Sequence, residues 1–429
     1  QMYKSWEQEK YKASHDSLTG LLNRDQFYED VHDMVNNYHD TTFYLICSNI
    51  KDFKFINEIF GMEKGNQVLL KQAKLMASNP SERTICARLM NDRFALCLPR
   101  EEFDEKRVAD SIKELQREFS GNSFHLHTYM GVYEIRDRDE AVSIMVDKAN
   151  IAADTIKNNY DCCVAYYDEH LLEISIEQRR LLGEFEPALQ KDEFAMYLQP
   201  QVNRDGAAKG AEALVRWVHP SRGILTPYAF IDILENAGLI YKLDLYIWEK
   251  AAQKLAEWKE KGYGSYHISV NISTKDFYII DIYETFTGLI NKYDISASNL
   301  HLEITETTLM TDFEKNMNII HKLQGVGFRV EIDDFGSGYS SLNMLKDISA
   351  DVLKIDMGFL RKSENEVKGQ DILESIIALA GKIGMDVITE GVETKKQLDM
   401  LTMMGCHEFQ GYYFSKPVPV SEFEEKYLV

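Results

Sequence analysis

The chain has few of the features that would hold it in a membrane or cross-link it. Its 429 residues include only six cysteines and eight prolines, and no two cysteines have the Cys-x-x-Cys spacing of a metal site. We therefore expect buried, reduced thiols and a cytoplasmic location. No apolar run is long enough to span a bilayer, and nothing at the start resembles a secretion signal. Because the chain begins with Gln1, we expect a fragment, which leaves open an upstream sensor or membrane segment.

Positive charge is also scarce. The chain has 48 Lys and Arg residues against 69 Asp and Glu residues, a net charge of −21. Such a protein repels the phosphate backbone of a nucleic-acid polymer, so we exclude that class of partner. A small anionic ligand stays compatible with this charge, because bound cations and a few Arg or Lys side chains can invert it locally. The length exceeds that of one ordinary core and predicts two domains.

The first part of the chain predicts an α+β domain. Residues 1–15 have the spacing of a lead-in helix, and residues 16–167 mix apolar strand-like runs with amphipathic helical ones. Residues 42–48 and 124–132 predict strands, and residues 85–98 predict a β-hairpin that turns at Met90–Arg93. This mixture favours a mostly antiparallel sheet. Residues 168–191 carry Leu and Ile at helical spacing and predict a helix that joins the domains.

The second part, residues 192–429, predicts a (β/α)₈ barrel. Eight short apolar or alternating runs are separated by helical stretches such as 243–259, 313–324 and 372–382. Regular alternation of strand and helix over about 250 residues is typical of this barrel. The predicted strands are 194–202, 211–217, 267–273, 300–306, 329–336, 352–356, 386–393 and 407–414.

Acidic side chains gather where these predicted strands end, which is where barrel enzymes place their catalytic groups. So many carboxylates in one mouth repel each other unless divalent cations lie among them. The ligands would all be oxygens, which indicates a hard ion such as Mg²⁺ or Mn²⁺, and adjacent Asp333 and Asp334 could bridge two ions. The alternative is a rim of ion pairs, in which Arg and Lys match the acids. For three single residues, Glu306, Asp356 and Glu393, a role as outer supports of the ligands stays equally open. The residues concerned are Glu212, Asn271, Glu303, Glu306, Asp333, Asp334, Lys354, Asp356, Glu390 and Glu393.

This second part resembles the EAL family of cyclic di-GMP phosphodiesterases. Glu212, Ala213 and Leu214 form the family signature, Arg216 extends it, and several further motifs agree in order over residues 176–429. The resemblance implies a barrel whose first strand runs antiparallel to the others, and hydrolysis of cyclic di-GMP to linear pGpG. Ser337, Thr389 and the pair Met357–Gly358 depart from the family pattern without removing a ligand or the base.

The resemblance also assigns roles to individual residues. Two Mg²⁺ or Mn²⁺ ions would be held by Glu212, Asn271, Glu303, Asp333, Asp334 and Glu390. Glu390 would be the general base, and Lys354 would lie beside the attacking water and the phosphate. The substrate contacts would be Gln199, Leu214, Arg216 and Gln410. The loop 334–342 would shape the metal site and a homodimer contact, with Glu306 as its anchor.

Residues 16 to about 168 resemble the GGDEF family of diguanylate cyclases, through residues 16–24 and 53–57, Gly61, Gly65 and the hairpin. The signature, however, reads Met90-Asn91-Asp92-Arg93-Phe94, and Asn49 replaces the second metal-binding carboxylate. Residues 81–84 lack the family's Arg-x-x-Asp inhibition motif. We therefore expect no cyclase activity.

Two interpretations of this first domain stay open. It binds GTP through Asn57 and Asp92 and regulates the barrel, or it is a dimerisation scaffold. For the whole chain, the leading hypothesis is a phosphodiesterase. The alternatives are a cyclic di-GMP receptor that signals through the 168–191 helix without hydrolysis, and a scaffold of two decayed domains, which the intact barrel motifs disfavour.

Overall fold

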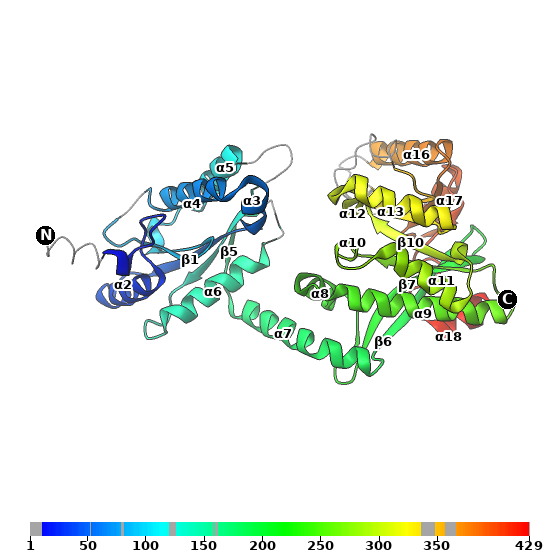
Figure 1. Cartoon of the computed structure of the whole chain (residues 1–429), viewed down its shortest axis with the longest axis horizontal. Helices are drawn as coiled ribbons and strands as arrows, with labels where there is room; N and C mark the ends of the chain where they lie inside the picture. The colour runs from blue at the N-terminus through cyan, green and yellow to red at the C-terminus, as the bar shows by residue number, and fades with distance from the viewer. Residues whose placement is uncertain are drawn as a thin grey trace. The chain divides into compact units, whose positions relative to one another are not determined.

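The computed structural model describes residues 11–51, 53–78, 81–119, 126–157, 159, 162–335, 348–356 and 366–428. The chain divides into two compact units between Arg179 and Arg180, and each is described by itself (Figure 1). Of the predicted lead-in helix, only residues 11–15 fall within the described part, and residues 11–14 are helical. No helix in the described part is both long and apolar enough to cross a bilayer.

The first unit contains the predicted α+β fold. Its five-stranded sheet has the order β2-β3-β1-β4-β5, and all pairings are antiparallel except β4–β5. Helices α2 and α6 pack on the face that carries Leu45, and Ile112 of α5 packs on the opposite face, which carries Ile46. The elements are α2 (Arg24–Asn37), β1 (Phe43–Ile50), α3 (Phe53–Phe60), α4 (Met62–Met76), β2 (Ile85–Met90), β3 (Arg93–Pro99), η1 (Arg100–Glu102), α5 (Glu105–Phe119), β4 (Thr128–Glu134), α6 (Val142–Thr155) and β5 (Val164–Tyr166).

A single helix, α7 (Glu169–Gln190), covers the segment predicted to join the domains. The division between the two compact units falls inside this helix.

The second unit contains the predicted barrel, and each of the eight predicted runs contains a strand. Strand β6 is antiparallel to both of its barrel neighbours, β7 and β14. The other barrel strands follow one another in the order β7-β9-β10-β11-β12-β13-β14, and each neighbouring pair in this order is parallel. The β6–β7 pairing closes the barrel. The barrel strands are β6 (Phe194–Val202), β7 (Ala208–His219), β9 (His267–Ile272), β10 (Leu300–Thr305), β11 (Val330–Phe335), β12 (Val352–Asp356), β13 (Asp386–Glu390) and β14 (Glu408–Phe409). Two short strands, β8 (Gly223–Leu225) and β15 (Val418–Pro419), pair antiparallel with β7 and β6, respectively.

Helices follow the strands and cover the outside of the barrel (Figure 1). Their apolar faces and the strands share one continuous core. The predicted helices at 243–259, 313–324 and 372–382 correspond to α9, α13 and α16. The elements are η2 (Pro227–Ala229), α8 (Ile231–Ala237), α9 (Ile240–Glu260), α10 (Asp276–Ile279), α11 (Ile282–Tyr293), η3 (Ala297–Asn299), α12 (Glu306–Thr311), α13 (Phe313–Val326), α16 (Glu366–Lys382), α17 (Lys395–Met403) and α18 (Val420–Tyr427).

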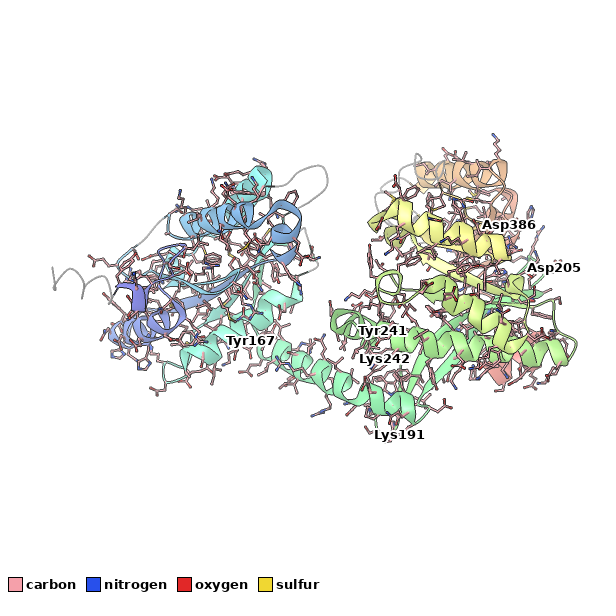
Figure 2. The ribbon with its side chains drawn as sticks, in the orientation of Figure 1. Tyr167, Lys191, Asp205, Tyr241, Lys242 and Asp386 are labelled. Atoms are coloured by element: carbon pink, nitrogen blue, oxygen red, sulfur yellow. The ribbon has the colours of Figure 1, made fainter. Side chains whose placement is uncertain are left out.

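The strand directions give the barrel two different ends. The carboxyl ends of β7 and β9–β14 meet at one end. Asp205, in the turn between β6 and β7, and Asp386, at the start of β13, lie at the other end (Figure 2). The two ends therefore carry different side chains and can have different chemistry.

An aromatic cluster anchors the first two barrel strands, and its loss should destabilise the barrel. Trp217 is fully buried, with its ring centroid 4.8 Å from that of Phe194 and 5.8 Å from that of Phe230. We expect Trp217→Ala to lower the free energy of unfolding of the barrel by about 3–5 kcal/mol, because it leaves a cavity. Urea unfolding followed by circular dichroism measures this.

The matched control lies one position along the same strand. Val218 is 45% exposed, so Val218→Ala should change the midpoint little. Equal shifts for the two variants would contradict the assigned packing.

Candidate active site

The barrel pairing brings the predicted acidic residues to neighbouring positions. In the parallel ladder, Glu303 of β10 pairs with Asn271 of β9, and Asp356 of β12 pairs with Glu390 of β13. Paired residues in adjacent strands point to the same face of the sheet. Residues scattered along the sequence therefore share one mouth of the barrel.

Lys354 of β12 lies at the centre of this mouth and is 0% exposed. Its Nζ is 2.6 Å from Glu390 Oε1, 2.9 Å from Glu303 Oε1, 3.4 Å from Glu212 Oε2 and 3.6 Å from Asp333 Oδ1. Burial alone would lower its pKa, but the four carboxylates together raise the pKa well above its usual value. Lys354 is therefore an ammonium ion at physiological pH.

One ammonium group does not balance four carboxylates. Burial raises the pKa of Glu390 to about 8, with Asp333 and Glu212 adding to the effect and Lys354 opposing it. Burial also raises the pKa of Glu303 well above its usual value, and Glu212 raises it further. In the absence of another cation, this mouth therefore retains protons at neutral pH.

The donor set fits hard divalent cations. No hydrogen-bond donor within the described ranges is aligned on either carboxylate oxygen of Glu303 or on Oε1 of Glu390, although both residues form ion pairs with Lys354. One shared ammonium group leaves these buried carboxylate oxygens short of partners, which is costly unless further cations contact them. The surrounding ligand atoms are oxygens, which Mg²⁺ and Mn²⁺ prefer.

A chain of amide groups fixes Glu212 of β7. Asn271 Nδ2 donates to Glu212 Oε1 at 3.1 Å, and Gln410 Nε2 donates to Glu212 Oε2. Gln410 also donates to Gln199 Oε1 at 3.3 Å, and Gln199 donates to the Ser415 carbonyl oxygen at 3.3 Å. The sequence indicated Gln410 only as a substrate contact. Its bond to Glu212 joins positions 198 residues apart, for which the sequence contains no local signal.

Leu214 and Arg216 project from the same face of β7 as Glu212, because alternate residues of a strand share a face. Both side chains are partly buried. The Arg216 guanidinium lies 5.6 Å from the centre of the Tyr197 ring, and its Nη1 donates to the Val215 carbonyl oxygen at 2.8 Å. The two predicted substrate contacts therefore follow Glu212 along the same face of one strand.

Asp334 and Glu306 lie at the edge of the site. Asp334 has φ of 56°, and its backbone N–H donates to Asp333 Oδ1 at 2.8 Å. Partial burial and the neighbouring Asp333 raise the pKa of Asp334. Glu306 begins α12. Residues 336–342 of the predicted regulatory loop lie outside the described residues, so the anchoring role of Glu306 stays a prediction.

In the first unit, the turn of the β2–β3 hairpin has a left-handed backbone conformation, which costs free energy for residues other than glycine. Asn91 has φ of 53°, in the left-handed region that favours glycine. Asp92 Oδ2 accepts from the Ile50 N–H at 3.4 Å, and burial raises the pKa of Asp92. The Asn49 amide donates to the Tyr129 hydroxyl at 3.4 Å.

Asn57 of α3 approaches α4 closely at Gly65. A Cβ atom at Gly65 would lie 1.9 Å from Asn57 Oδ1, so a larger residue there would displace the Asn57 amide. The roles of Asn57 and Asp92 in GTP binding stay predictions.

Known proteins share both units. Residues 183–417 match the family model described as EAL domain, and residues 13–161 match the one described as diguanylate cyclase, GGDEF domain. The chain is 29% identical over 424 residues to the bifunctional diguanylate cyclase/cyclic di-GMP phosphodiesterase MucR of Pseudomonas aeruginosa, covering 96% of this chain and 61% of the relative. It is 26% identical over 419 residues to the cyclic di-GMP phosphodiesterase PdeR of Escherichia coli, covering 97% of this chain and 63% of the relative.

Solved structures agree with this match. The PaMucR phosphodiesterase in complex with c-di-GMP has a TM-score of 0.54 and 33% identity, and the match covers 57% of this chain and 99% of that one. The S helix-GGDEF-EAL part of Vibrio cholerae LapD has a TM-score of 0.61 at 18% identity, with 96% and 98% covered, which bears on the fold alone. The chain spans about three-fifths of the length of the two curated relatives named above. The chain belongs to the EAL domain family, whose phosphodiesterases are metal-dependent, and carries a GGDEF domain ahead of its barrel.

Proposed function

We propose that the barrel hydrolyses cyclic di-GMP to linear pGpG with two Mg²⁺ or Mn²⁺ ions. The observation that carries this proposal is the cluster of four carboxylates around the buried Lys354 ammonium. Relatives named as cyclic di-GMP phosphodiesterases, and a solved relative in complex with c-di-GMP, support the choice of substrate.

The residues that would hold the ions are Glu212, Asn271, Glu303, Asp333, Asp334 and Glu390. When bound, two such ions lower the pKa of a water molecule and neutralise charge on the phosphate oxygens. Each of these residues lies on or at the end of a barrel strand, so the backbone keeps their positions rigid. The hydrogen bonds of Asn271 and Gln410 orient the Glu212 carboxylate before the cations bind.

Glu390 and Lys354 have different roles in the proposed reaction. Glu390 acts as the general base and takes the proton of the attacking water. Lys354 places a positive charge beside the phosphate and stabilises the negative charge that develops in the transition state. Their 2.6 Å contact fixes the Glu390 carboxylate in one orientation.

Four residues would bind the nucleotide around this centre. Arg216 supplies a positive charge that pairs with a phosphate, and Leu214 supplies apolar contact to a base or ribose. Gln199 supplies a carboxamide that pairs with a polar edge of guanine. Gln410, which donates to Gln199, supplies a second carboxamide beside it. The proposal also includes a homodimer formed through the barrel and the loop 334–342.

We propose that the first unit has no cyclase activity and that it either regulates the barrel or acts as a dimerisation scaffold. Two features support this loss of activity. Asn91 keeps a glycine-type turn but adds a side chain where the phosphates would approach the backbone, and the engaged Asn49 amide is a weaker metal ligand than a carboxylate. Calorimetric titration with GTP separates the two roles. Heat that disappears in Asn57→Ala supports nucleotide binding, and the absence of heat leaves the scaffold.

Hydrolysis is tested with the full chain, cyclic di-GMP and Mg²⁺ or Mn²⁺, followed by chromatographic separation of the nucleotides. We expect pGpG to form only when a divalent cation is present. Unchanged cyclic di-GMP, with binding still measurable, would replace the enzyme with a receptor that does not hydrolyse its ligand.

Glu212→Ala and Glu390→Ala should each lower turnover by about 10²-fold or more, the first through loss of a metal ligand and the second through loss of the base. The control is Glu260→Ala, which removes an exposed carboxylate at the end of α9 and should keep full activity. Near-normal turnover in either site variant would show that the assigned roles are wrong.

The apparent affinity for Mn²⁺ should rise with pH. The pKa of Glu390 is raised to about 8 in the cation-free site, so at pH values below about 8 a bound proton competes with the cation. Affinity should therefore increase as the pH approaches about 8 and change little above it. Calorimetry in buffers of different ionisation enthalpy should also detect proton release on binding. An affinity independent of pH would contradict this coupling.

A further inference from the structure

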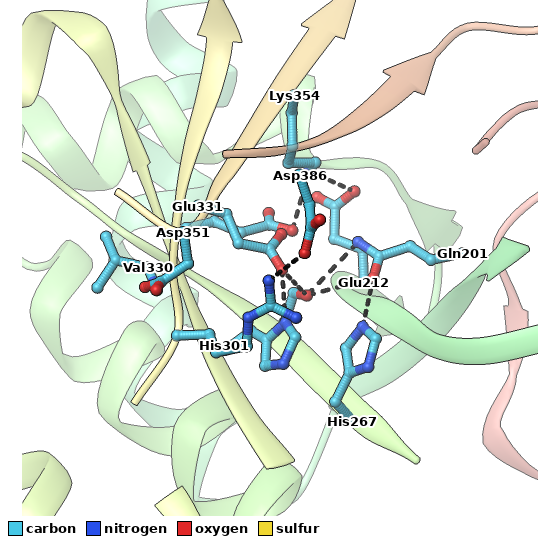
Figure 3. Close-up of polar contacts among 12 residues, drawn as sticks. Gln201, Glu212, His267, His301, Val330, Glu331, Asp351, Lys354 and Asp386 are labelled. Atoms are coloured by element: carbon cyan, nitrogen blue, oxygen red, sulfur yellow. Dashed lines mark hydrogen bonds and ion pairs between the residues drawn. The ribbon is translucent and has the colours of Figure 1, made fainter. Parts of the chain in front are cut away.

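A second polar cluster lies inside the barrel, nearer than the acidic residues to the amino-terminal ends of strands β9, β10 and β11. It consists of His267 of β9, His301 of β10 and Glu331 of β11, and one ligand atom from each lies within 4.8 Å of the others. Figure 3 shows this cluster together with Lys354 and Glu212. Glu331 is 0% exposed. None of the three side chains has a role in the proposed hydrolysis.

Adjacent strands bring these residues together, and the backbone leaves room for them. The His267 and His301 rings stack with their centroids 3.8 Å apart and their planes within 5°. Gly210 of β7 lies against the edge of His267, where a Cβ atom would be 2.4 Å from Nε2. A larger residue at position 210 would displace the imidazole.

Each imidazole has one nitrogen held by an oxygen atom outside the cluster. His267 Nε2 lies 2.7 Å from Gln201 Oε1, and His301 Nε2 lies 3.2 Å from the Ser298 carbonyl oxygen. Because both oxygens are acceptors, the nitrogens facing them carry hydrogen. Metal-bound histidines usually donate their second N–H to an oxygen in this way, which fixes the tautomer and leaves the other nitrogen for the metal.

Inside the cluster, His301 already pairs with Glu331, and His267 is neutral. Burial, together with the neighbouring His301, lowers the pKa of His267 to about 3, so this imidazole is neutral at physiological pH. His301 Nδ1 lies 2.6 Å from Glu331 Oε1, and Ser269 Oγ donates to the same oxygen at 3.2 Å. The other oxygen of Glu331, Oε2, is buried and has no hydrogen-bond partner in the part of the chain that the structure covers.

A cavity of about 580 Å³ opens onto the cluster and gives it access to water. His267, His301 and Glu331 line this cavity. Two ion pairs, Arg329–Asp386 at 2.5 Å and Lys209–Glu408, lie at the same end of the barrel and also contribute lining residues.

We propose that His267, His301 and Glu331 bind a transition-metal ion of the Zn²⁺ class, with a water molecule from the cavity as the fourth ligand. Two imidazole nitrogens and one carboxylate are a ligand set that Zn²⁺ accepts, whereas the oxygen-rich catalytic mouth suits Mg²⁺ or Mn²⁺. Binding tilts the stacked rings until their lone pairs converge. The hydrogen between His301 Nδ1 and Glu331 leaves as a proton, and the ion links strands β9, β10 and β11. This proposal does not depend on the proposed hydrolysis.

The site is tested by titrating the metal-free full chain with Co²⁺ while excess Mg²⁺ occupies the oxygen-rich mouth. We expect one Co²⁺ per chain with the intense visible absorption of four-coordinate cobalt, displaced by one equivalent of Zn²⁺. Zn²⁺ should also raise the thermal unfolding midpoint of the barrel. His267→Gln should lose both effects and keep the far-ultraviolet circular dichroism spectrum of the folded chain.

The matched control is His219→Gln. His219 is also buried in the barrel unit but pairs with Glu184 at 2.9 Å, so this variant should bind Co²⁺ normally. If the unaltered chain shows nothing but the weak absorption of six-coordinate cobalt, the proposal is overturned, and His301 and Glu331 are then a buried ion pair. Retention of the intense band in His267→Gln would also overturn it. If His267→Gln unfolds, X-ray absorption at the zinc edge of the unaltered chain decides, because the absence of imidazole ligands excludes the site.

Discussion

The active site depends on the burial of one ammonium group among four carboxylates. Lys354 is the positive charge that contacts Glu212, Glu303, Asp333 and Glu390. Removing Lys354 would leave four carboxylates without a compensating charge in a low-dielectric interior, so the five groups act as a unit. The negative charge that Lys354 does not balance attracts further cations. The same arrangement that organises the strand ends therefore also prepares the site for divalent metals.

Much of this organisation could be predicted from the sequence. Eight apolar runs became eight barrel strands, because alternation of strand and helix has few compact solutions. The acidic residues at their ends met in one mouth, because parallel strands end together. The antiparallel direction of β6, by contrast, came from the resemblance to a family, since a strand's apolar pattern contains no information about its direction.

Other features could not be read from the sequence because they join distant positions. The Gln410–Glu212 bond needs the closed barrel, and so does the ring stack of His267 on His301. In the sequence, each of these histidines is a single residue within an apolar run and carries no ligand signal. The positive φ of Asn91 arises in the same way, because the folded hairpin imposes a glycine-type turn on whatever residue occupies it.

The most direct test of the central claim is anomalous X-ray diffraction from crystals of the full chain grown with Mn²⁺. If excess carboxylate charge around Lys354 recruits two cations, two manganese peaks should appear about 3.5–4 Å apart in contact with Glu303, Asp333 and their neighbours. Lys354 Nζ should then keep its contact with Glu390 beside the metals. An active-site mouth without manganese, in which Lys354 alone contacts the four carboxylates, would contradict the claim.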